Sequence, residues 1–209
     1  MKKTAALIIF LTILIGAVTI LSACSNSSSD QKPNIPKDLK EYATDSSGNP
    51  TSYFKNEYDE KGNCIKNSNY DSRGNLLGST EYEYDENGNE IKYIIYDAEG
   101  VVQSQGKKEY DDQNRLIKFT DIDGDGVIVS YIVREYNDKG FESRIYNYNG
   151  DGTLKTYDEY EYGDNDELVK MTKYEGDGTI RYYIIYSVDE NGNEISSRYD
   201  ADGNLVDVS

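Results

Sequence analysis

Apolar and polar residues alternate along most of the chain from residue 44 onward, and short acidic segments that contain glycine interrupt the alternation at regular intervals. Successive side chains of a β-strand point to opposite faces of a sheet, so this alternation is typical of strands, whereas no window shows a sustained helical period. All three prolines precede residue 51, so the repeats beyond it lack the residue that most disrupts strands. The pattern therefore predicts β-strands separated by tight turns over residues 44–209.

The interruptions form a repeat with two alternating spacings. The residue before each acidic turn, most often tyrosine, recurs at intervals of 14 and 12 residues, and only the last interval, of 11, departs from this alternation. These anchor residues are Thr44, Tyr58, Tyr70, Tyr84, Tyr96, Tyr110, Ile122, Tyr136, Tyr148, Tyr162, Tyr174, Val188 and Tyr199. The unit is therefore 26 residues long, contains two turns, and occurs about six times.

The two spacings predict two kinds of hairpin. After Tyr84 the next apolar residue in register is Ile91, and this pairing centres the hairpin on Asn87-Gly88. Asn-Gly is the preferred two-residue type I′ loop, because both of its central residues need positive φ. The same reasoning pairs Tyr58 with Ile65 across Lys61-Gly62, and Val188 with Ile195 across Asn191-Gly192.

The alternate turns bring the apolar partner one residue closer, as in Tyr96 with Val102, and leave three-residue loops that end in glycine. A type I turn followed by a glycine in the left-handed region is the usual hairpin of this length. The predicted loops are Ser72-Arg73-Gly74, Ala98-Glu99-Gly100, Gly150-Asp151-Gly152, Gly176-Asp177-Gly178 and Ala201-Asp202-Gly203. The tyrosine and the apolar residue beyond the turn are then cross-strand neighbours, worth roughly 0.2 to 1 kcal/mol per pair.

Hairpins joined end to end predict an all-β fold, an antiparallel meander of about twelve strands built from tandem 26-residue units. Loops of two and three residues would leave an odd stagger in each unit, which would exchange the two faces of the sheet from one unit to the next. Equivalent units cannot do this, so we expect either a further bulge in each longer strand or an incorrect loop assignment. An even residual stagger would tilt the strands and curl the single sheet or wind it into a spiral shell.

With the repeats laid out, the segments "YEYDENGNEI", "YDSRGNL", "YDAEG" and "YDADGNL" resemble YD repeats of the RHS type over about residues 44–209. The resemblance implies a structural role in which strands wind into a spiralling hollow shell, and in that family the shell can enclose a toxin domain. The arginine frequently found after the turn glycine in that family is replaced here by other residues, such as Asn75, Asn89 and Asn193.

The first 24 residues have a different pattern, with Lys2 and Lys3, an apolar run of 17 residues, and "LSAC" at 21–24. This order resembles a bacterial lipoprotein signal, and the resemblance implies cleavage before Cys24 and a lipid on its sulfur. We therefore expect a signal peptide over residues 1–23, then lipidated Cys24 and a flexible tether over 24–43, with the repeats held at a membrane outside the cytoplasm. The alternative, an uncleaved membrane helix, would need roughly 20 apolar residues.

The chain carries 39 acidic and 22 basic residues, a formal net charge of −17. A field of this sign repels nucleic acid and anionic lipid headgroups, and it favours cationic partners, divalent ions or simple solubility. Nucleic acid is therefore not an expected partner.

Calcium is an alternative ligand, because Asp121, Asp123 and Asp125 alternate ahead of glycine as at the start of a calcium-binding loop. The twelfth position of such a loop is Ile132, which supplies no closing carboxylate. The segment Gly124-Asp125-Gly126 is also in phase with the glycine turns of later units, so the repeat explains it without calcium. No other cofactor is expected.

Composition argues against an enzyme, since the chain contains no histidine, the commonest general base. Cys64, the only cysteine besides Cys24, has no evident activating partner. We interpret it as a surface residue at a repeat position where other units carry glutamate. Hydrolysis of glycosides by two paired carboxylates remains a third alternative.

The binding hypothesis rests on tyrosine, of which the chain has 21. Rows of tyrosine on a rigid sheet form amphipathic surfaces suited to proteins or sugars, although most are expected to be structural. Tyr131, Tyr146, Tyr157 and Tyr183 lie off the anchor positions and are the candidates for exposure. We therefore expect a lipid-anchored, non-catalytic module that binds or scaffolds a protein or glycan partner.

Overall fold

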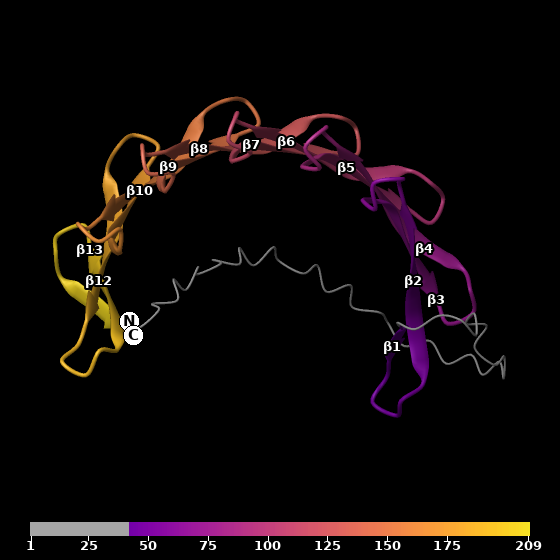
Figure 1. Cartoon of the computed structure of the whole chain (residues 1–209), viewed down its shortest axis with the longest axis horizontal. Coiled ribbons are helices and arrows are strands. Elements are labelled where there is room, and N and C mark those ends of the chain that lie inside the picture. The colour runs from indigo at the N-terminus through magenta and orange to yellow at the C-terminus, as the bar shows by residue number, and fades with distance from the viewer. Residues whose placement is uncertain (1–41) are drawn as a thin grey trace. The chain divides into compact units, whose positions relative to one another are not determined.

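The computed structural model describes residues 42–209, which form fourteen strands in a single antiparallel sheet (Figure 1). The strands pair in chain order, so the prediction of an all-β meander is confirmed. They are β1 (Tyr42–Thr44), β2 (Pro50–Tyr58), β3 (Cys64–Asp71), β4 (Leu76–Tyr84), β5 (Glu90–Asp97), β6 (Val102–Tyr110), β7 (Leu116–Asp123), β8 (Ile128–Tyr136), β9 (Glu142–Asn149), β10 (Leu154–Tyr162), β11 (Leu168–Glu175), β12 (Ile180–Val188), β13 (Glu194–Asp200) and β14 (Leu205–Val208).

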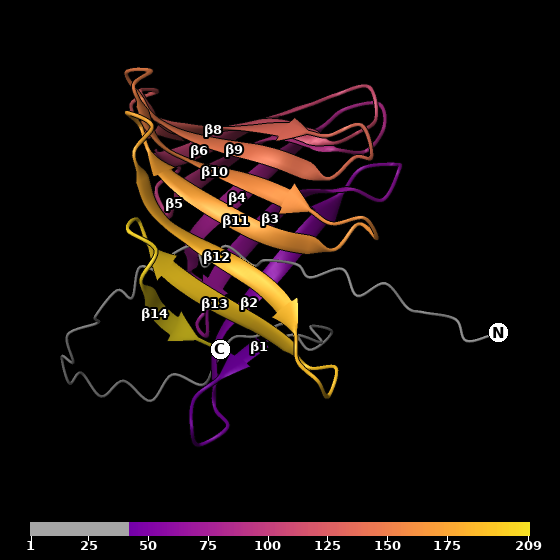
Figure 2. The same cartoon turned by 90° about the vertical axis from the view of Figure 1, so that its left-hand side faces the viewer.

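Within the described residues, β1 includes Tyr42 and Ala43, which precede the expected first residue of the repeats, Thr44. The expected signal peptide, the lipidated Cys24 and the tether as far as residue 41 lie outside the described residues. Figures 1 and 2 show that the sheet curves along its length, and β1 and β14 do not pair with each other.

All thirteen turns that join the strands share one geometry. In the turn 85–89 the Asp85 amide donates to the Asn89 carbonyl oxygen (2.9 Å) and the Gly88 amide donates to the Asp85 carbonyl oxygen (3.2 Å), and the equivalent two bonds recur in every turn. Positive φ occurs only at the fourth position, here Gly88 at 86°. This is the type I turn with a glycine bulge that the sequence predicted for the alternate turns alone.

The type I′ prediction for Asn87-Gly88, Lys61-Gly62 and Asn191-Gly192 is therefore wrong, since the first residue of each pair does not adopt positive φ. The physical reason lies in the aspartate that precedes each turn. Asp85 Oδ1 accepts hydrogen bonds from the amides of Asn87 (2.9 Å) and Asn89 (2.8 Å), which holds Glu86-Asn87-Gly88 as a three-residue loop.

The register follows from this shared turn. Tyr84 pairs with Glu90 and Glu83 with Lys92, so Ile91 is the extra residue of a bulge and not the partner of Tyr84. Tyr58 likewise pairs with Cys64, and Val188 with Glu194. In the alternate turns the predicted partners are correct, as Tyr96 pairs with Val102.

The stagger between units is even, as equivalence of the units requires. Tyr82 pairs with Tyr93, and Tyr93 pairs with Gly106. The residue one unit beyond Tyr82 is Lys108, which lies two residues past Gly106. Each unit is thus displaced by two residues along the strands, so every unit keeps its side chains on the same faces and the strands tilt.

The one irregular interval in the sequence corresponds to the one hairpin without a bulge. Val188 pairs with Glu194 and Ser187 with Ile195, with no shift in register through β12 and β13. β13 has seven residues, whereas the other short strands between β3 and β11 have eight. The missing residue is the one that bulges elsewhere, so the two faces are preserved here too.

The sheet is a single layer with little apolar core, and among the described residues only Tyr53 and Ile122 are buried hydrophobic side chains. Cross-strand side-chain pairs and backbone hydrogen bonds therefore supply most of the stabilisation. Each strand packs only against its immediate neighbours in the sequence.

At the strand ends that are not joined by a turn, tyrosine hydroxyl groups hydrogen-bond the backbone of the neighbouring strand. Backbone pairing of β3 with β4 stops at Lys66 and Glu81, and beyond it the Tyr84 hydroxyl donates to the Cys64 carbonyl oxygen (2.9 Å). This satisfies a carbonyl that the backbone ladder leaves unpaired. The same bond recurs from Tyr110 to Glu90, from Tyr136 to Leu116 and from Tyr162 to Glu142.

Candidate binding surface

Three of the four candidate tyrosines lie at one repeated position and stack on an anchor tyrosine of the following strand. The ring centroids are 4.6 Å apart for Tyr131 and Tyr148, 4.5 Å for Tyr157 and Tyr174, and 5.0 Å for Tyr183 and Tyr199. The interplanar angles are 12°, 6° and 9°. Residues paired across strands share a face, so these pairs mark one face of the sheet.

Tyr146, the fourth candidate, lies between two of these pairs on the same face. Its centroid is 6.4 Å from that of Tyr148 and 5.7 Å from that of Tyr157. We call the set of Tyr131, Tyr146, Tyr148, Tyr157, Tyr174, Tyr183 and Tyr199 the tyrosine band. All seven side chains are half-buried.

The flat faces of the rings in the band are partly covered. Coplanar neighbouring rings could not approach to 4.5 Å, so each stacked pair covers one face of both rings. Lysines lie over further faces, with Lys118 Nζ 5.4 Å from the Tyr131 centroid and Lys170 Nζ 5.6 Å from that of Tyr183. At Tyr131 and Tyr183 a tyrosine and a lysine thus cover the flat faces of the ring, which leaves its edge and hydroxyl group accessible.

Acidic turns border the band along one edge of the sheet. A Cβ atom at Gly152 would lie 3.7 Å from the Tyr131 hydroxyl oxygen, and one at Gly203 would lie 3.6 Å from that of Tyr183, so the rings extend toward the turns. The residues just before the turn glycines beside the band are Asp151, Asp177 and Asp202, all exposed.

Two of these carboxylates are held ionised by their own turns. The Thr153 hydroxyl and then its amide donate to Asp151 and hold the pKa of that carboxyl below its usual range. The Thr179 amide and then its hydroxyl lower the pKa of Asp177 in the same way. The edge next to the band is thus negatively charged at neutral pH.

The same face carries a ladder of ion pairs that sequence analysis missed. A glutamate in each of four long strands pairs with a basic residue in the next short strand, and both occupy register positions next to the bulge. The charged atoms are separated by 2.6 Å in Glu83–Lys92, 3.3 Å in Glu109–Lys118, 3.9 Å in Glu135–Arg144 and 2.9 Å in Glu161–Lys170. The recurring nine-residue spacing of these pairs was the signal that could have revealed them.

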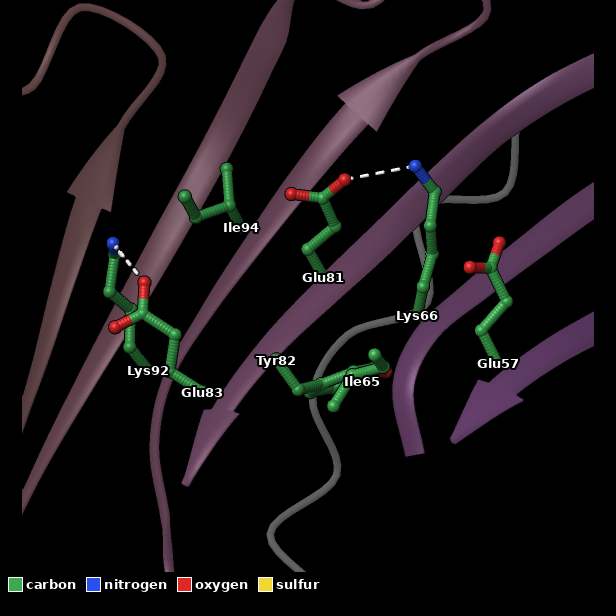
Figure 3. Close-up of a pocket in the computed structure, with 8 residues that line it drawn as sticks. All are labelled: Glu57, Ile65, Lys66, Glu81, Tyr82, Glu83, Lys92 and Ile94. Carbon is green, nitrogen blue, oxygen red and sulfur yellow. Dashed lines mark hydrogen bonds and ion pairs between the residues drawn. The ribbon is translucent and has the colours of Figure 1, made fainter. Parts of the chain in front are cut away.

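A shallow groove of about 350 Å³ lies on the charged part of this face (Figure 3). Ile94 lies between two ion pairs, Lys66–Glu81 (2.9 Å) and Lys92–Glu83 (2.6 Å). The other residues that line the groove are Glu57, Ile65 and Tyr82. Because both lysines are neutralised by glutamates of the same groove, it offers little attraction to an anionic ligand.

The opposite face carries tyrosines whose hydroxyl groups are partly withdrawn from solvent. Burial raises the pKa of the Tyr160 hydroxyl strongly, and it also raises the pKa values of Tyr93 and Tyr186 on this face. The Tyr93 ring lies directly against Gly106, where any side chain would collide with it, and stacks on Phe119 at 6.4 Å. These rings pack against the sheet and contribute to its stability.

The three candidate calcium ligands are not gathered into a site. Asp123 is the aspartate of a turn, and its Oδ1 accepts from the amides of Asp125 (3.0 Å) and Val127 (2.9 Å). Asp121 lies within β7, where it pairs with Gly106 and Ser130. Over residues 42–209, no group of three or more histidine, cysteine, aspartate or glutamate side chains is placed to hold a metal ion.

No family model matches the chain, and no curated protein matches it. Among solved structures, the crystal structure of TcdB2-TccC3 is 14% identical over 80% of this chain and 12% of that chain, with a TM-score of 0.42. A porin-like protein from Bacteroides uniformis is 14% identical over 72% of this chain and 57% of that chain, with a TM-score of 0.36. TcdB2-TccC3 without its hypervariable C-terminal region is 13% identical over 79% of this chain and 14% of that chain, with a TM-score of 0.21.

These similarities concern the fold alone. The chain spans little more than a tenth of the TcdB2-TccC3 chain. No helix within residues 42–209 has the length and apolar character needed to cross a membrane.

Proposed function

We propose that this chain is a non-catalytic β-repeat module that binds a basic protein partner along the tyrosine band. The observation that carries the proposal is the continuity of the band, whose half-buried rings run from β8 to β13 beside a row of exposed acidic turns. Stacked pairs recur on every second strand, which corresponds to about 10 Å between pairs. An extended polypeptide laid across the strands would contact several pairs.

The ring geometry favours a protein over a glycan. Sugars bind aromatic side chains by stacking on a flat ring face, but the faces within Tyr157 and Tyr174 cover each other. Hydroxyl groups and ring edges are suited to hydrogen bonds and to contacts with protein side chains.

Charge favours a basic partner. The net charge is −17, and Asp151 and Asp177 are held ionised beside the band. Attraction between opposite charges speeds association and weakens as salt screens it.

We also propose that the chain is a YD-repeat protein of the RHS type, supported by the identical turn in every unit. Arg115 supports this further, because it follows the left-handed Asn114 and its Nε donates to Asp111 Oδ2 (2.7 Å). Arginine thus occupies in one turn the position that asparagine occupies in six of the other twelve turns.

The proposed location is the outside of a membrane, through a lipid on Cys24. The motif "LSAC" supports it. Metabolic labelling with a fatty acid tests it, with label expected on the parent chain and lost in Cys24→Ala. Label retained by that variant would contradict the proposal.

Binding is tested by fluorescence anisotropy with three labelled extended peptides of equal length, one rich in arginine, one neutral and one rich in glutamate. We expect the arginine-rich peptide alone to bind, and its affinity to fall as salt rises. Substitution of Asp151, Asp177 and Asp202 by asparagine should weaken this binding.

A matched control removes the same charge from the other edge of the sheet, with Asp112, Asp138 and Asp164 changed to asparagine. All three are exposed. Equal weakening by the two triple variants, or no preference among the peptides, would contradict a basic partner at the band.

A further inference from the structure

Two turns of this protein have the same six-residue sequence in different surroundings. The hexapeptide Asp-Glu-Asn-Gly-Asn-Glu occurs at 85–90 and again at 189–194. Both copies form the same turn, with Gly88 and Gly192 each at a φ of 86°. Any difference in reactivity between them must come from the rest of the sheet.

Asn-Gly is the dipeptide most open to deamidation, the reaction that makes asparagine thermolabile. The glycine amide nitrogen loses its proton and bonds to the asparagine side-chain carbonyl carbon, and ammonia leaves. Water then opens the resulting five-membered ring, which yields aspartate or isoaspartate. Glycine favours the first step because it has no Cβ to obstruct the approach.

The side chain of Asn87 is restrained by the neighbouring turn. Its Nδ2 donates to Asn114 Oδ1 (3.0 Å), and Asn114 belongs to the next turn on the same edge. Within residues 42–209 the Asn191 side chain has no such partner in a neighbouring turn, and it hydrogen-bonds the Asp189 carboxylate of its own turn. The Asn191 side chain is therefore held by its own turn alone, whereas that of Asn87 is also held by a second turn.

The hairpin around Asn191 also lacks two contacts that brace the one around Asn87. Tyr84 precedes the turn that contains Asn87, and its hydroxyl donates a hydrogen bond to the Cys64 carbonyl oxygen. Val188 occupies the equivalent position before the turn that contains Asn191, and it has no hydroxyl group. The Glu83–Lys92 ion pair is replaced by Ser187 and Ile195. Attack requires the glycine amide to leave its bond to the aspartate carbonyl, so the less braced turn should open more often.

A third Asn-Gly pair, Asn149-Gly150, is held more tightly. Asn149 Nδ2 donates to Thr153 Oγ1 (2.9 Å). Any side chain at Gly150 would collide with the Ile128 carbonyl oxygen, so this backbone is packed against β8.

We infer that Asn191 is a deamidation site, and that the β12–β13 turn is the first part of the described sheet to be altered as the protein ages. Aspartate adds a negative charge beside Asp189 and Glu190. Isoaspartate also lengthens the backbone by one carbon, which disrupts the bond from the Gly192 amide to the Asp189 carbonyl oxygen (3.0 Å).

The test is incubation of the full chain at mildly alkaline pH followed by tryptic digestion and mass spectrometry. Cleavage after lysine and arginine places Asn87, Asn149 and Asn191 in three separate peptides. We expect Asn191 to deamidate several-fold faster than Asn87, and Asn149 to be slowest. In denaturant, Asn87 and Asn191 should react at the same rate because their local sequences are identical.

The matched variant is Asn114→Gly, which removes the acceptor for Asn87 and places glycine at a φ of 59°, a conformation that glycine adopts readily. It should raise the rate at Asn87 toward that at Asn191 and leave Asn191 unchanged. Equal rates at the two sites in the folded parent chain, or an unchanged rate at Asn87 in the variant, would overturn the inference.

Discussion

At the scale of single residues, the aspartate that opens each turn has the largest structural effect. Asp85 Oδ1 accepts hydrogen bonds from two backbone amides, and Asp85 Oδ2 accepts one from Asn89 Nδ2 (2.9 Å). These bonds, that of Asn89 first, hold the pKa of Asp85 below its usual range. Equivalent shifts occur at Asp59, Asp71, Asp189 and Asp200.

These shifts predict that the sheet loses stability in acid. A carboxyl whose pKa is lowered on folding binds its proton less tightly in the folded state than in the unfolded state. Its contribution is therefore complete above the unfolded pKa near 3.8 and is lost as pH falls through the lower folded value. Thermal midpoints measured from about pH 6 down to pH 2 should fall most steeply below the unfolded pKa. A midpoint that rises or stays level over that range would contradict the role given to these aspartates.

The hydroxyl bonds at the strand ends predict a second residue-level effect. Tyr136→Phe removes the donor to the Leu116 carbonyl oxygen (2.8 Å) and should cost about 1 kcal/mol of unfolding free energy, measured by urea denaturation. Tyr183→Phe is the control, because within residues 42–209 its hydroxyl makes no hydrogen bond. Equal losses in the two variants would show that the carbonyl bond contributes little.

At the scale of the hairpin, the two turns without glycine show why the left-handed position tolerates another residue. Asn114 has a φ of 59° and Asp166 a φ of 69°. The Asn114 side chain bonds Asn87, and the Asp166 carboxylate accepts from Lys139 Nζ (2.5 Å), so each contacts the preceding turn on the same edge. The backbone strain of these residues is offset by a contact that glycine cannot make.

The bulge predicts how a short strand responds to deletion. Removal of Ile91 should convert the β4–β5 hairpin to the form seen in β12–β13, with both faces kept and a loss of about 1 kcal/mol in unfolding free energy. Removal of Ile94 should cost clearly more, because residues on one side of the gap would then exchange faces. Urea denaturation of the two deletion variants compares them, and equal losses would argue against the assigned bulge.

The strands and the alternate turns could be predicted from the sequence. Alternating apolar and polar residues indicate strands, and a glycine indicates the turn position that needs positive φ. The partner of Tyr84 could not, since the apolar Ile91 looks in register and a bulge leaves no mark in the apolar pattern. The odd stagger that followed from this error did reveal that a loop was misassigned. For the candidate site, the 26-residue spacing of Tyr131, Tyr157 and Tyr183 was visible, but stacking on the anchors required the register.

At the scale of the whole sheet, stability is distributed along the chain and not concentrated in one core. Contacts join only consecutive strands, the behaviour of repeat proteins in which each unit interacts with its neighbours. Removal of residues 189–209 should therefore leave β2 to β12 folded, with the circular dichroism spectrum of a β-sheet. Loss of all strand signal in this truncated chain would show a dependence on the last hairpin that the contacts do not explain.

The placement of the acidic residues predicts no response to calcium. Asp123 is committed to its turn, and the described region gathers no cluster of ligands. The thermal midpoint should be the same with calcium and with a calcium chelator. A clear rise with calcium would instead support the calcium alternative, and Asp125→Asn would then show whether this segment binds it.

The two-residue displacement between equivalent units also bears on how such a chain changes in length. Because equivalent units between β3 and β11 share the same turns and the same register, a recombination event that duplicates or removes one whole unit of the gene there creates a junction already present elsewhere in the protein. Only an event out of phase with the 26-residue period would need compensating substitutions. Length is therefore a trait that selection could adjust independently of the local fold.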